Sequence, residues 1–274
     1  MPAAAEDLSG VTAVVTGAAS GIGRALARLL ARRRAHVHVV DRDGAGAAAV
    51  AAEVGGVAST VDVTDADAVL ALADRVFAAG PVDLLFNNAG IAHGGPVAET
   101  SPADWRRLVD VNLLGVVHGM HAFLPRLVEQ DRPAHVVNTA SAAGLVPVPG
   151  LSAYSATKAA VVSLSDAADL ELRGTGVRVH ALCPGIIDTD IVRRSTMSGS
   201  WAGRQAGAVR LYATRGTSPD VVARQALEGV ARGRLVITSP RYQVAPQWLL
   251  LRTAPRVSHA LSAAAYRLLE RRAR

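Results

Sequence analysis

Tyr154 and Lys158 stand four residues apart, so a helix there places both side chains on one face, one turn apart. A free tyrosine has a pKa of about 10 and is a poor base at neutral pH, but a nearby ammonium group favours the phenolate. Lys158 is the only lysine among 29 lysines and arginines, and its compact charge suits this task better than a broad guanidinium group. The spacing predicts that Tyr154 acts as an acid and base, with two idle surface residues as the alternative.

A glycine-rich turn follows the first apolar run, where Gly17, Gly21 and Gly23 lead into a helical stretch. Glycines at these positions allow a tight turn and let the backbone approach a pyrophosphate, which the positive end of the helix attracts. Ser20 and Ile22 complete the turn without adding positive charge. The pattern predicts a nucleotide-binding turn, with an ordinary connection between strand and helix as the alternative.

Asp41 ends the second apolar run, 18 residues beyond Gly23. A carboxylate at this place accepts hydrogen bonds from the ribose hydroxyls of a dinucleotide and repels a 2′-phosphate. Arg42 follows directly and could bind such a phosphate. Because the turn itself carries no positive charge, the sequence favours NAD over NADP.

The elements that must position these residues alternate between short β-branched runs and helical stretches. Seven strands are predicted, at residues 11–15, 37–40, 57–61, 82–86, 135–137, 177–182 and 235–237. Helices are predicted over residues 21–33, 44–54, 65–78, 103–129, 152–173 and 219–231, and capping signals at Ser101-Pro102 and Ser218-Pro219 begin two of them. The alternation predicts an α/β fold, a doubly wound parallel sheet of seven strands with helices on both faces.

The chain of 274 residues is long enough to bury a full core, and no linker divides it. Residues 1–240 are expected to form one domain, and residues 241–274 a C-terminal extension rather than an independent domain. The net charge of +6 lies wholly in this extension, which holds seven arginines and one glutamate. The body is neutral, so nucleic acid is not an expected partner.

Features of export are missing from the sequence. The start of the chain carries Glu6 and Asp7 where a secretory signal needs a basic and then an apolar stretch, and no run of 18 apolar residues follows. The single cysteine, Cys183, cannot form an internal disulfide. A cytoplasmic protein is expected.

Further motifs stand at fixed places in this order of elements: Asn87-Asn88-Ala89-Gly90 after the fourth strand, Ser141 after the fifth, and Pro184-Gly185 after the sixth. With the glycine-rich turn and the pair of Tyr154 and Lys158, the set resembles the short-chain dehydrogenase/reductase (SDR) family in its compact form, over about residues 10–240. The resemblance implies a Rossmann-like fold and a nicotinamide coenzyme, whose positive ring also favours the phenolate of Tyr154.

The same resemblance implies roles for two further catalytic residues. Ser141 would donate a hydrogen bond to the substrate oxygen and hold it near Tyr154. Asn112 would order a water beside Lys158 and complete a proton path to solvent. Asparagine is a poor helix former and can bend a helix, so a polar packing residue is the alternative for Asn112.

The resemblance also assigns contacts to the coenzyme. Asp62 and Val63 match a pair at the adenine, while Ile187 and Thr189 match positions that hold the nicotinamide carboxamide. The expected coenzyme-binding residues are Gly17, Ser20, Gly21, Ile22, Gly23, Asp41, Asp62, Val63, Asn88, Ala89, Gly90, Tyr154, Lys158, Pro184, Gly185, Ile187 and Thr189.

Substrate choice is expected in residues 190–216, where such folds place a mobile lid and where residues 195–201 show little periodicity. His93 is a candidate for the substrate mouth. His118 and His121 share one helix face without a third ligand, so no metal site is predicted. The residues expected to face the pocket are Ala142, Leu145, Val146, Leu151 and Trp201. Because they are apolar, the sequence indicates that the substrate is an apolar alcohol or ketone.

The extension departs from the compact family pattern. After Trp248 comes a helical run whose apolar face consists of Val257, Leu261, Ala264, Ala265 and Leu268, with Arg256, Arg267 and Arg271 to one side. A basic amphipathic helix of this kind can lie on an anionic membrane surface. Packing against the domain or a second subunit is the alternative.

Together these features predict an NAD(P)-dependent oxidoreductase that interconverts a secondary alcohol and a ketone, on an apolar substrate of lipid, steroid or retinoid type. A 3-oxoacyl-thioester reductase is one alternative, although Asp41 argues against the NADP that it would normally use. A non-enzymatic nucleotide-binding scaffold or regulator is the other, although a scaffold has no need for Tyr154 and Lys158 together. The resemblance also implies a homodimer or homotetramer, with helices 103–129 and 152–173 as contact surfaces.

Overall fold

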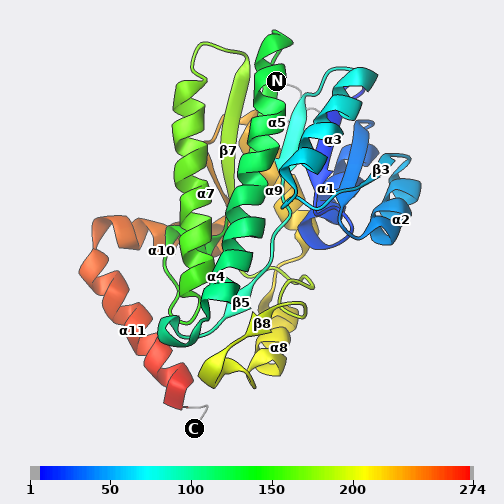
Figure 1. Ribbon diagram of the computed structural model, residues 1–274. Helices are drawn as coiled ribbons and strands as arrows, with labels where there is room; N and C mark the ends of the chain where they lie inside the picture. The colour runs from blue at the N-terminus through cyan, green and yellow to red at the C-terminus, as the bar shows by residue number, and fades with distance from the viewer. Residues whose placement is uncertain (1–6, 272–274) are drawn as a thin grey trace.

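The computed structural model describes the backbone of residues 7–271 and the side chains through residue 267. The start of the chain, residues 1–6, on which the expectation of no secretory signal rests, lies outside the described residues. Its main sheet has seven parallel strands in the order β3-β2-β1-β4-β6-β7-β9 (Figure 1). The strands are β1 (Thr12–Thr16), β2 (His36–Asp41), β3 (Val57–Thr60), β4 (Leu84–Asn87), β6 (Ala134–Thr139), β7 (Val177–Pro184) and β9 (Val236–Ser239). Every predicted strand is confirmed, and so is the doubly wound fold.

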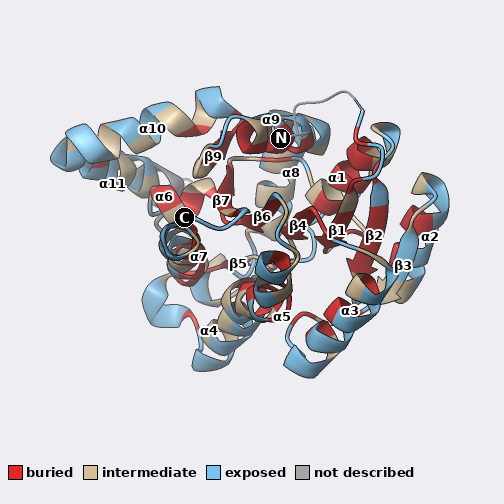
Figure 2. Cartoon of the chain, turned by 90° about the horizontal axis from the view of Figure 1, so that it is seen from above, coloured by how far each residue is buried: buried red, intermediate tan, exposed pale blue. Residues whose placement is uncertain are grey.

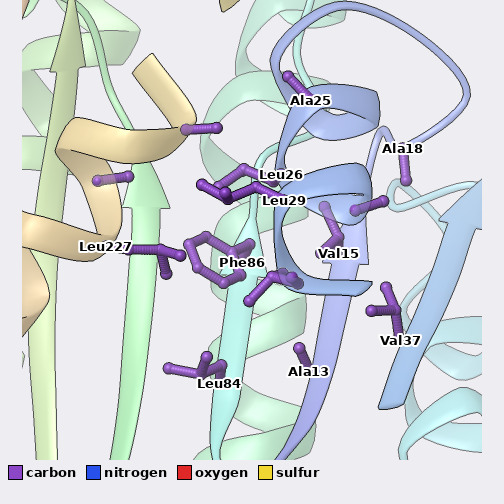
Figure 3. Packing of buried hydrophobic residues seen from close by; sticks show 14 of the residues in the cluster. Ala13, Val15, Ala18, Ala25, Leu26, Leu29, Val37, Leu84, Phe86 and Leu227 are labelled. Carbon is purple, nitrogen blue, oxygen red and sulfur yellow. The ribbon is translucent and has the colours of Figure 1, made fainter. Parts of the chain in front are cut away.

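Helices cover both faces of this sheet, with buried residues between the layers (Figure 2). On one face lie α1 (Gly21–Arg32), α2 (Gly44–Val54) and α9 (Pro219–Ala231), and on the other α3 (Ala66–Ala79), α5 (Gly115–Glu129) and α7 (Ser152–Glu171). Successive strand residues point to opposite cores, because Val15 packs with the α1 side and Val14 with the α7 side. Figure 3 shows the α1 side, where Leu26 and Leu29 meet Phe86 and Leu227.

The predicted helix over residues 103–129 is interrupted. It consists of α4 (Pro102–Val109), a π-helical segment η3 (Asp110–Leu114) and α5. The stretch 102–129 is long and apolar enough to meet the length and composition criteria for a membrane span, which core helices meet too. Its buried side chains, such as Val116, Met120 and Phe123, belong to the core on the α7 side.

Residues 190–216 are more ordered than the sequence predicted. They contain β8 (Thr196–Met197), the 3-10 helix η4 (Gly199–Trp201) and α8 (Gln205–Arg215), and β8 pairs in parallel with β5 (His93–Gly94). No residue between 205 and 215 is buried, so α8 has no core-facing apolar stripe that periodicity could reveal. Two short helices, η2 (Val97–Glu99) and α6 (Ala142–Leu145), were also not predicted.

The C-terminal extension forms two helices, α10 (Arg241–Thr253) and α11 (Pro255–Arg271). Val244 of α10 is buried in the core on the α7 side, and Trp248 packs against it. Along α11 the predicted apolar face does not pack on the domain, because Val257 and Leu261 are 52% and 58% exposed. The side chains of Leu268 and Arg271, which belong to that prediction, lie outside the described residues.

Candidate active site

The carboxyl ends of five neighbouring strands bring the predicted site residues to one edge of the sheet. Thr16 ends β1, Asp41 β2, Asn87 β4, Thr139 β6 and Pro184 β7. The direction of strand order reverses between β1 and β4. In open α/β sheets, ligands bind in the crevice at such a switch point.

Tyr154 and Lys158 lie together on the first turns of α7, as predicted. The Lys158 Nζ atom is 5.9 Å from the centroid of the Tyr154 ring. It donates a 2.8 Å hydrogen bond to the carbonyl oxygen of Thr139, a partner that the sequence did not indicate. Lys158 is buried, and this burial lowers the pKa of its ammonium group to about 8.

Ser141 lies beside Tyr154, and the two side chains are hydrogen-bonded. Ser141 also caps α6, because its Oγ accepts a 3.1 Å hydrogen bond from the backbone N–H of Ala143. Burial raises the pKa of Tyr154 to about 12, and the bond to Ser141 opposes this rise. Lys158 and the positive nicotinamide ring were expected to favour the phenolate together, and in the protein without coenzyme burial favours the phenol.

Two residues near this pair were missed by the sequence analysis. Cys183 of β7 is fully buried, and burial raises the pKa of its thiol to about 12 while the charge of Lys158 opposes the rise. Tyr212, on α8, is close enough to Tyr154 to raise the pKa of Tyr154 further. The position of Cys183 between the predicted strand 177–182 and the Pro184-Gly185 motif was an available signal, whereas Tyr212 had none.

Asn112 occupies the π-helical segment and is fully buried. Its Oδ1 accepts a 2.8 Å hydrogen bond from the backbone N–H of Ile91, and its Nδ2 donates one of 3.0 Å to the Ile91 carbonyl. A Cβ added at Gly90 would lie 3.2 Å from Asn112 Oδ1 and 3.3 Å from Lys158 Nζ. Asn112 is therefore brought to the lysine, as expected, and π-segments are frequent at functional sites.

The glycine-rich turn and the segment after β4 interlock. Gly17 has a φ of +66°, and a Cβ added there would lie 2.7 Å from the Cα of Ala89. The Nδ2 of Asn88 donates a 3.0 Å hydrogen bond to the carbonyl of Thr16, and its Oδ1 accepts one of 3.3 Å from the Thr139 hydroxyl. Asn88 thus ties β1, β4 and β6 together.

The start of α1 fits a dinucleotide. A Cβ added at Gly23 would overlap the carbonyl of Gly17, so only glycine permits this tight a turn. The side chain of Ser20 makes no capping bond, and residues 21–24 carry no acidic group, so the positive helix end is open to an anion. Asp41 is tied to the turn, because its Oδ2 accepts a 3.0 Å hydrogen bond from the N–H of Ala19.

Asp62 and Val63 follow β3 near the opposite end of this crevice. Asp62 accepts hydrogen bonds from the N–H and hydroxyl of Thr64, at 2.9 and 2.8 Å. The Val63 carbonyl accepts a 2.8 Å hydrogen bond from Nδ1 of His118, and the Val63 side chain contacts the helix at Gly115. His118 therefore holds the loop that was predicted to contact the adenine, a role that the sequence did not reveal.

The segment after β7 reaches back to the glycine-rich turn. Ile187 is buried in the core on the α1 side, and a Cβ added at Gly21 would lie 3.2 Å from Cγ2 of Thr189. Gly21 and Thr189 line one surface cleft together with Arg24. On the other side, a Cβ added at Gly185 would lie 2.9 Å from Oε1 of Gln243 on α10. The C-terminal extension thus contacts the Pro184-Gly185 motif.

His93 fastens the predicted lid to the body of the protein. It is 2% exposed, and its ring nitrogens form hydrogen bonds of 2.8 Å with Thr196 Oγ1 and 3.0 Å with Ser198 Oγ. Burial lowers the pKa of His93. The candidate for the substrate mouth is thus the residue that joins β5 to β8.

The expected pocket residues divide into two groups. Leu145 belongs to the core on the α7 side, and Ala142 and Val146 pack against that core. Leu151 and Trp201 are half-buried. No group of three or more histidine, cysteine or acidic residues within 7–271 is placed to hold a metal ion.

Comparisons with known proteins give one family. The family model of the short chain dehydrogenases matches residues 11–198. A probable oxidoreductase, EphD, of Mycobacterium tuberculosis is 40% identical over 245 residues, which are 85% of this chain and 40% of EphD. The chain thus spans less than half the length of this relative.

A second relative is the 1-deoxy-11-beta-hydroxypentalenate dehydrogenase of Streptomyces exfoliatus, 43% identical over 192 residues, with 67% of this chain and 70% of the relative covered. Among solved structures, a short chain dehydrogenase/reductase from Burkholderia phymatum in complex with NAD superposes with a TM-score of 0.81. It is 32% identical, and the match covers 92% of this chain and 96% of that one.

Proposed function

Because this chain belongs to the short-chain dehydrogenase family, whose members are oxidoreductases acting on CH–OH and C=O groups, we propose that it interconverts a secondary alcohol and a ketone on an apolar substrate, with NAD as coenzyme. The observation that carries the proposal is the cluster at the start of α7. There Tyr154 is hydrogen-bonded to Ser141, and the buried Lys158 lies on the same helix face.

Each residue of this cluster has a separate role in the proposed reaction. Bound NAD supplies the nicotinamide ring that exchanges hydride with the substrate carbon. Ser141 holds the substrate oxygen by a hydrogen bond. The Tyr154 phenolate accepts the proton of that oxygen in oxidation, and the Tyr154 hydroxyl returns it in reduction. Lys158 contributes positive charge that favours the phenolate, and its bond to the Thr139 carbonyl fixes where that charge lies. Asn112, which is hydrogen-bonded to the backbone of Ile91, begins the path by which the proton reaches solvent.

Asp41 supports NAD over NADP. Its carboxylate is held at the glycine-rich turn by the N–H of Ala19, where it can accept hydrogen bonds from ribose hydroxyls and repel a 2′-phosphate. Arg42 lines a hollow with Asp62 and Arg106, so positive charge is close by. The Asp41 carboxylate is hydrogen-bonded directly to the turn that would bind the pyrophosphate.

A screen of apolar alcohols tests the proposal. Cyclohexanol, 2-octanol and 1-phenylethanol are incubated with the protein and NAD or NADP, and the absorbance of the reduced coenzyme is followed. We expect turnover with NAD, its loss by about 10²- to 10⁴-fold in Tyr154→Phe, and unchanged NAD binding in that variant by calorimetry. Binding of NAD without turnover of any alcohol or of the matching ketones would favour the nucleotide-binding scaffold instead.

We also propose that the extension contacts an anionic membrane surface through its outer face. Tyr242 and Leu249 on α10, and Val257 and Leu261 on α11, are between 52% and 73% exposed. The extension carries the whole net charge of the chain, +6. Residues 241–267 include four arginines and no acidic residue, so charge complementarity favours anionic lipid over a second copy of the same basic segment.

Vesicle co-sedimentation tests this contact. The full chain should bind vesicles containing phosphatidylserine and not vesicles of phosphatidylcholine alone, and binding should weaken with salt. Val257→Ser with Leu261→Ser should weaken it, whereas Leu211→Ser, on the exposed side of α8, should not. Equal, negligible sedimentation with both kinds of vesicle would contradict the proposal, and concentration-dependent dimerisation lost in the double variant would identify a second copy as the partner.

A homodimer or homotetramer in the cytoplasm stays a proposal as well. Exposed apolar side chains on the two helices expected at the contact support it, since Val128 of α5 is 37% and Leu170 of α7 59% exposed. Light scattering after size exclusion measures the mass directly.

A further inference from the structure

The end of α11 returns to the predicted substrate lid. Figure 1 shows this helix running from α10 back toward the end of the molecule where β8 and α8 lie. The ring of Tyr266 is stacked on that of Trp201 in η4, with centroids 6.4 Å apart and planes inclined by 28°. The extension and the lid therefore meet through two aromatic side chains that are 65 positions apart in the sequence.

Trp201 lies directly on backbone, because its neighbours are glycines. A Cβ added at Gly94 of β5 would lie 3.3 Å from Cε3 of the indole, and one added at Gly150 would overlap the ring. Gly150 precedes Leu151, the residue before α7, and Tyr154 stands in the first turn of that helix. Trp201 therefore covers the loop that leads from Ser141 to Tyr154.

Several contacts attach the lid to the body. Its helix α8 buries no residue, but His93 is hydrogen-bonded to Thr196 and Ser198, Arg107 to Thr196, and the N–H of Ser200 to Glu99. Within the lid, the guanidinium group of Arg204 lies 5.2 Å from the centroid of the Trp201 ring. The stack on Tyr266 adds an aromatic contact between Trp201 and a helix anchored through α10.

We propose that Tyr266 is a positioning residue of the substrate site: it holds Trp201 against Gly94 and Gly150, so that the C-terminal extension completes the outer wall of the pocket. This inference rests on the function proposed above. An indole held in this place presents hydrocarbon and excludes water, which suits an apolar alcohol or ketone. Tyr266 touches no reacting atom, so its loss should weaken substrate binding rather than the chemical step.

Kinetics of three variants test the inference, with whichever alcohol of the screen the wild type turns over best. Tyr266→Ala should raise KM about fivefold, an effect typical of a lost aromatic pair, with kcat within about twofold and the Kd for NAD unchanged. Tyr266→Phe keeps the ring and should behave as wild type. Tyr242→Ala removes an exposed tyrosine of α10 and is the matched control.

A second measurement does not depend on turnover. In a background of Trp105→Phe and Trp248→Phe, acrylamide quenching reports the accessibility of Trp201 alone. Quenching should increase in Tyr266→Ala and return to the background value in Tyr266→Phe. Unchanged KM and unchanged quenching in Tyr266→Ala would overturn the inference, as would an equal KM effect in Tyr242→Ala. If the wild type turns over no alcohol, the proposed function fails, while quenching still decides whether Tyr266 holds Trp201.

Discussion

Tyr154 and Lys158 are each shifted by burial toward their uncharged forms. The pKa of Tyr154 is raised to about 12 and that of Lys158 is lowered to about 8. A buried phenol is a competent proton donor but a poor acceptor until positive charge is close to it. In the coenzyme-free protein burial therefore favours the phenol, which is the form that the proposed carbonyl reduction requires, whereas the proposed oxidation requires the phenolate.

This asymmetry predicts opposite pH profiles for the two directions. Below the pKa of Tyr154 the phenolate fraction rises about tenfold per pH unit, so kcat/KM for alcohol oxidation should rise between pH 7 and pH 9. Ketone reduction needs the phenol and should stay flat or fall over the same range. Initial rates in both directions, with the same enzyme, provide their own control. Oxidation that is independent of pH would indicate a proton acceptor other than Tyr154.

Helix α5 packs closely against the sheet at Gly119, which lies against the side chain of Asn87 in β4. A Cβ added at Gly119 would overlap the side-chain oxygen of Asn87. Asn87 donates a 2.9 Å hydrogen bond to Asn138, which in turn donates one of 3.0 Å to Ser165 of α7. This buried chain of polar groups fixes β4 and β6, the strands whose ends lead to Gly90 and Ser141, relative to the helices.

Gly119→Ala should therefore destabilise the fold by about 1–3 kcal/mol, because an extra methyl group forces Asn87 away from its partner. Gly207→Ala is the matched control, since Gly207 is also helical and has no atom within 4 Å of the added Cβ. That substitution should be neutral or stabilise by up to about 1 kcal/mol. Urea unfolding at constant m measures both, and equal midpoints for the two variants would contradict the prediction.

Long elements with a clear periodicity were predictable, and short or exposed ones without it were missed. The β-branched runs give six strands that lie between two cores, and they also give β3, whose residues are mostly exposed. The glycines of residues 17–23 are required by contacts that only glycine allows. Helix α8 has no buried stripe, and β5 and β8 are two residues each, too short for a period of two to appear. The π-segment changes the helical spacing by a single residue, and the stack of Tyr266 on Trp201 joins distant positions that no local pattern relates.

A pair of buried histidines links the centre of the sheet to its edge. His135 of β6 and His180 of β7 stack with centroids 5.1 Å apart. His180 Nδ1–H donates a 2.7 Å hydrogen bond to the Arg234 carbonyl, so His180 Nε2 accepts the 2.8 Å bond from His135 Nδ1–H. Both rings are thereby held neutral, and burial lowers the pKa of His135 to about 3.

The whole molecule should consequently lose stability in mild acid. The unfolded chain takes up a proton at His135 below its ordinary pKa of 6.5, whereas the folded chain resists until about pH 3. The free energy of unfolding should therefore fall as the pH decreases through this window, by about 2 kcal/mol between pH 7.5 and pH 5 for this one group. Urea unfolding at both values measures the loss.

His135→Asn keeps a hydrogen-bond donor and cannot titrate, so it should lose less stability between the two pH values than the wild type. His121→Asn, at an exposed position of α5, should keep the wild-type loss. Parallel curves for the wild type and His135→Asn would assign the acid sensitivity to other groups.

Cys183 has a consequence for handling the protein. The single thiol is sealed beneath the tyrosine and lysine, and its raised pKa leaves almost no thiolate at neutral pH. Alkylating reagents can therefore modify this thiol only when β7 separates from its neighbours. The rate at which iodoacetamide adds one group to the chain, measured by mass spectrometry, therefore reports how often Cys183 becomes exposed. No engineered probe is needed.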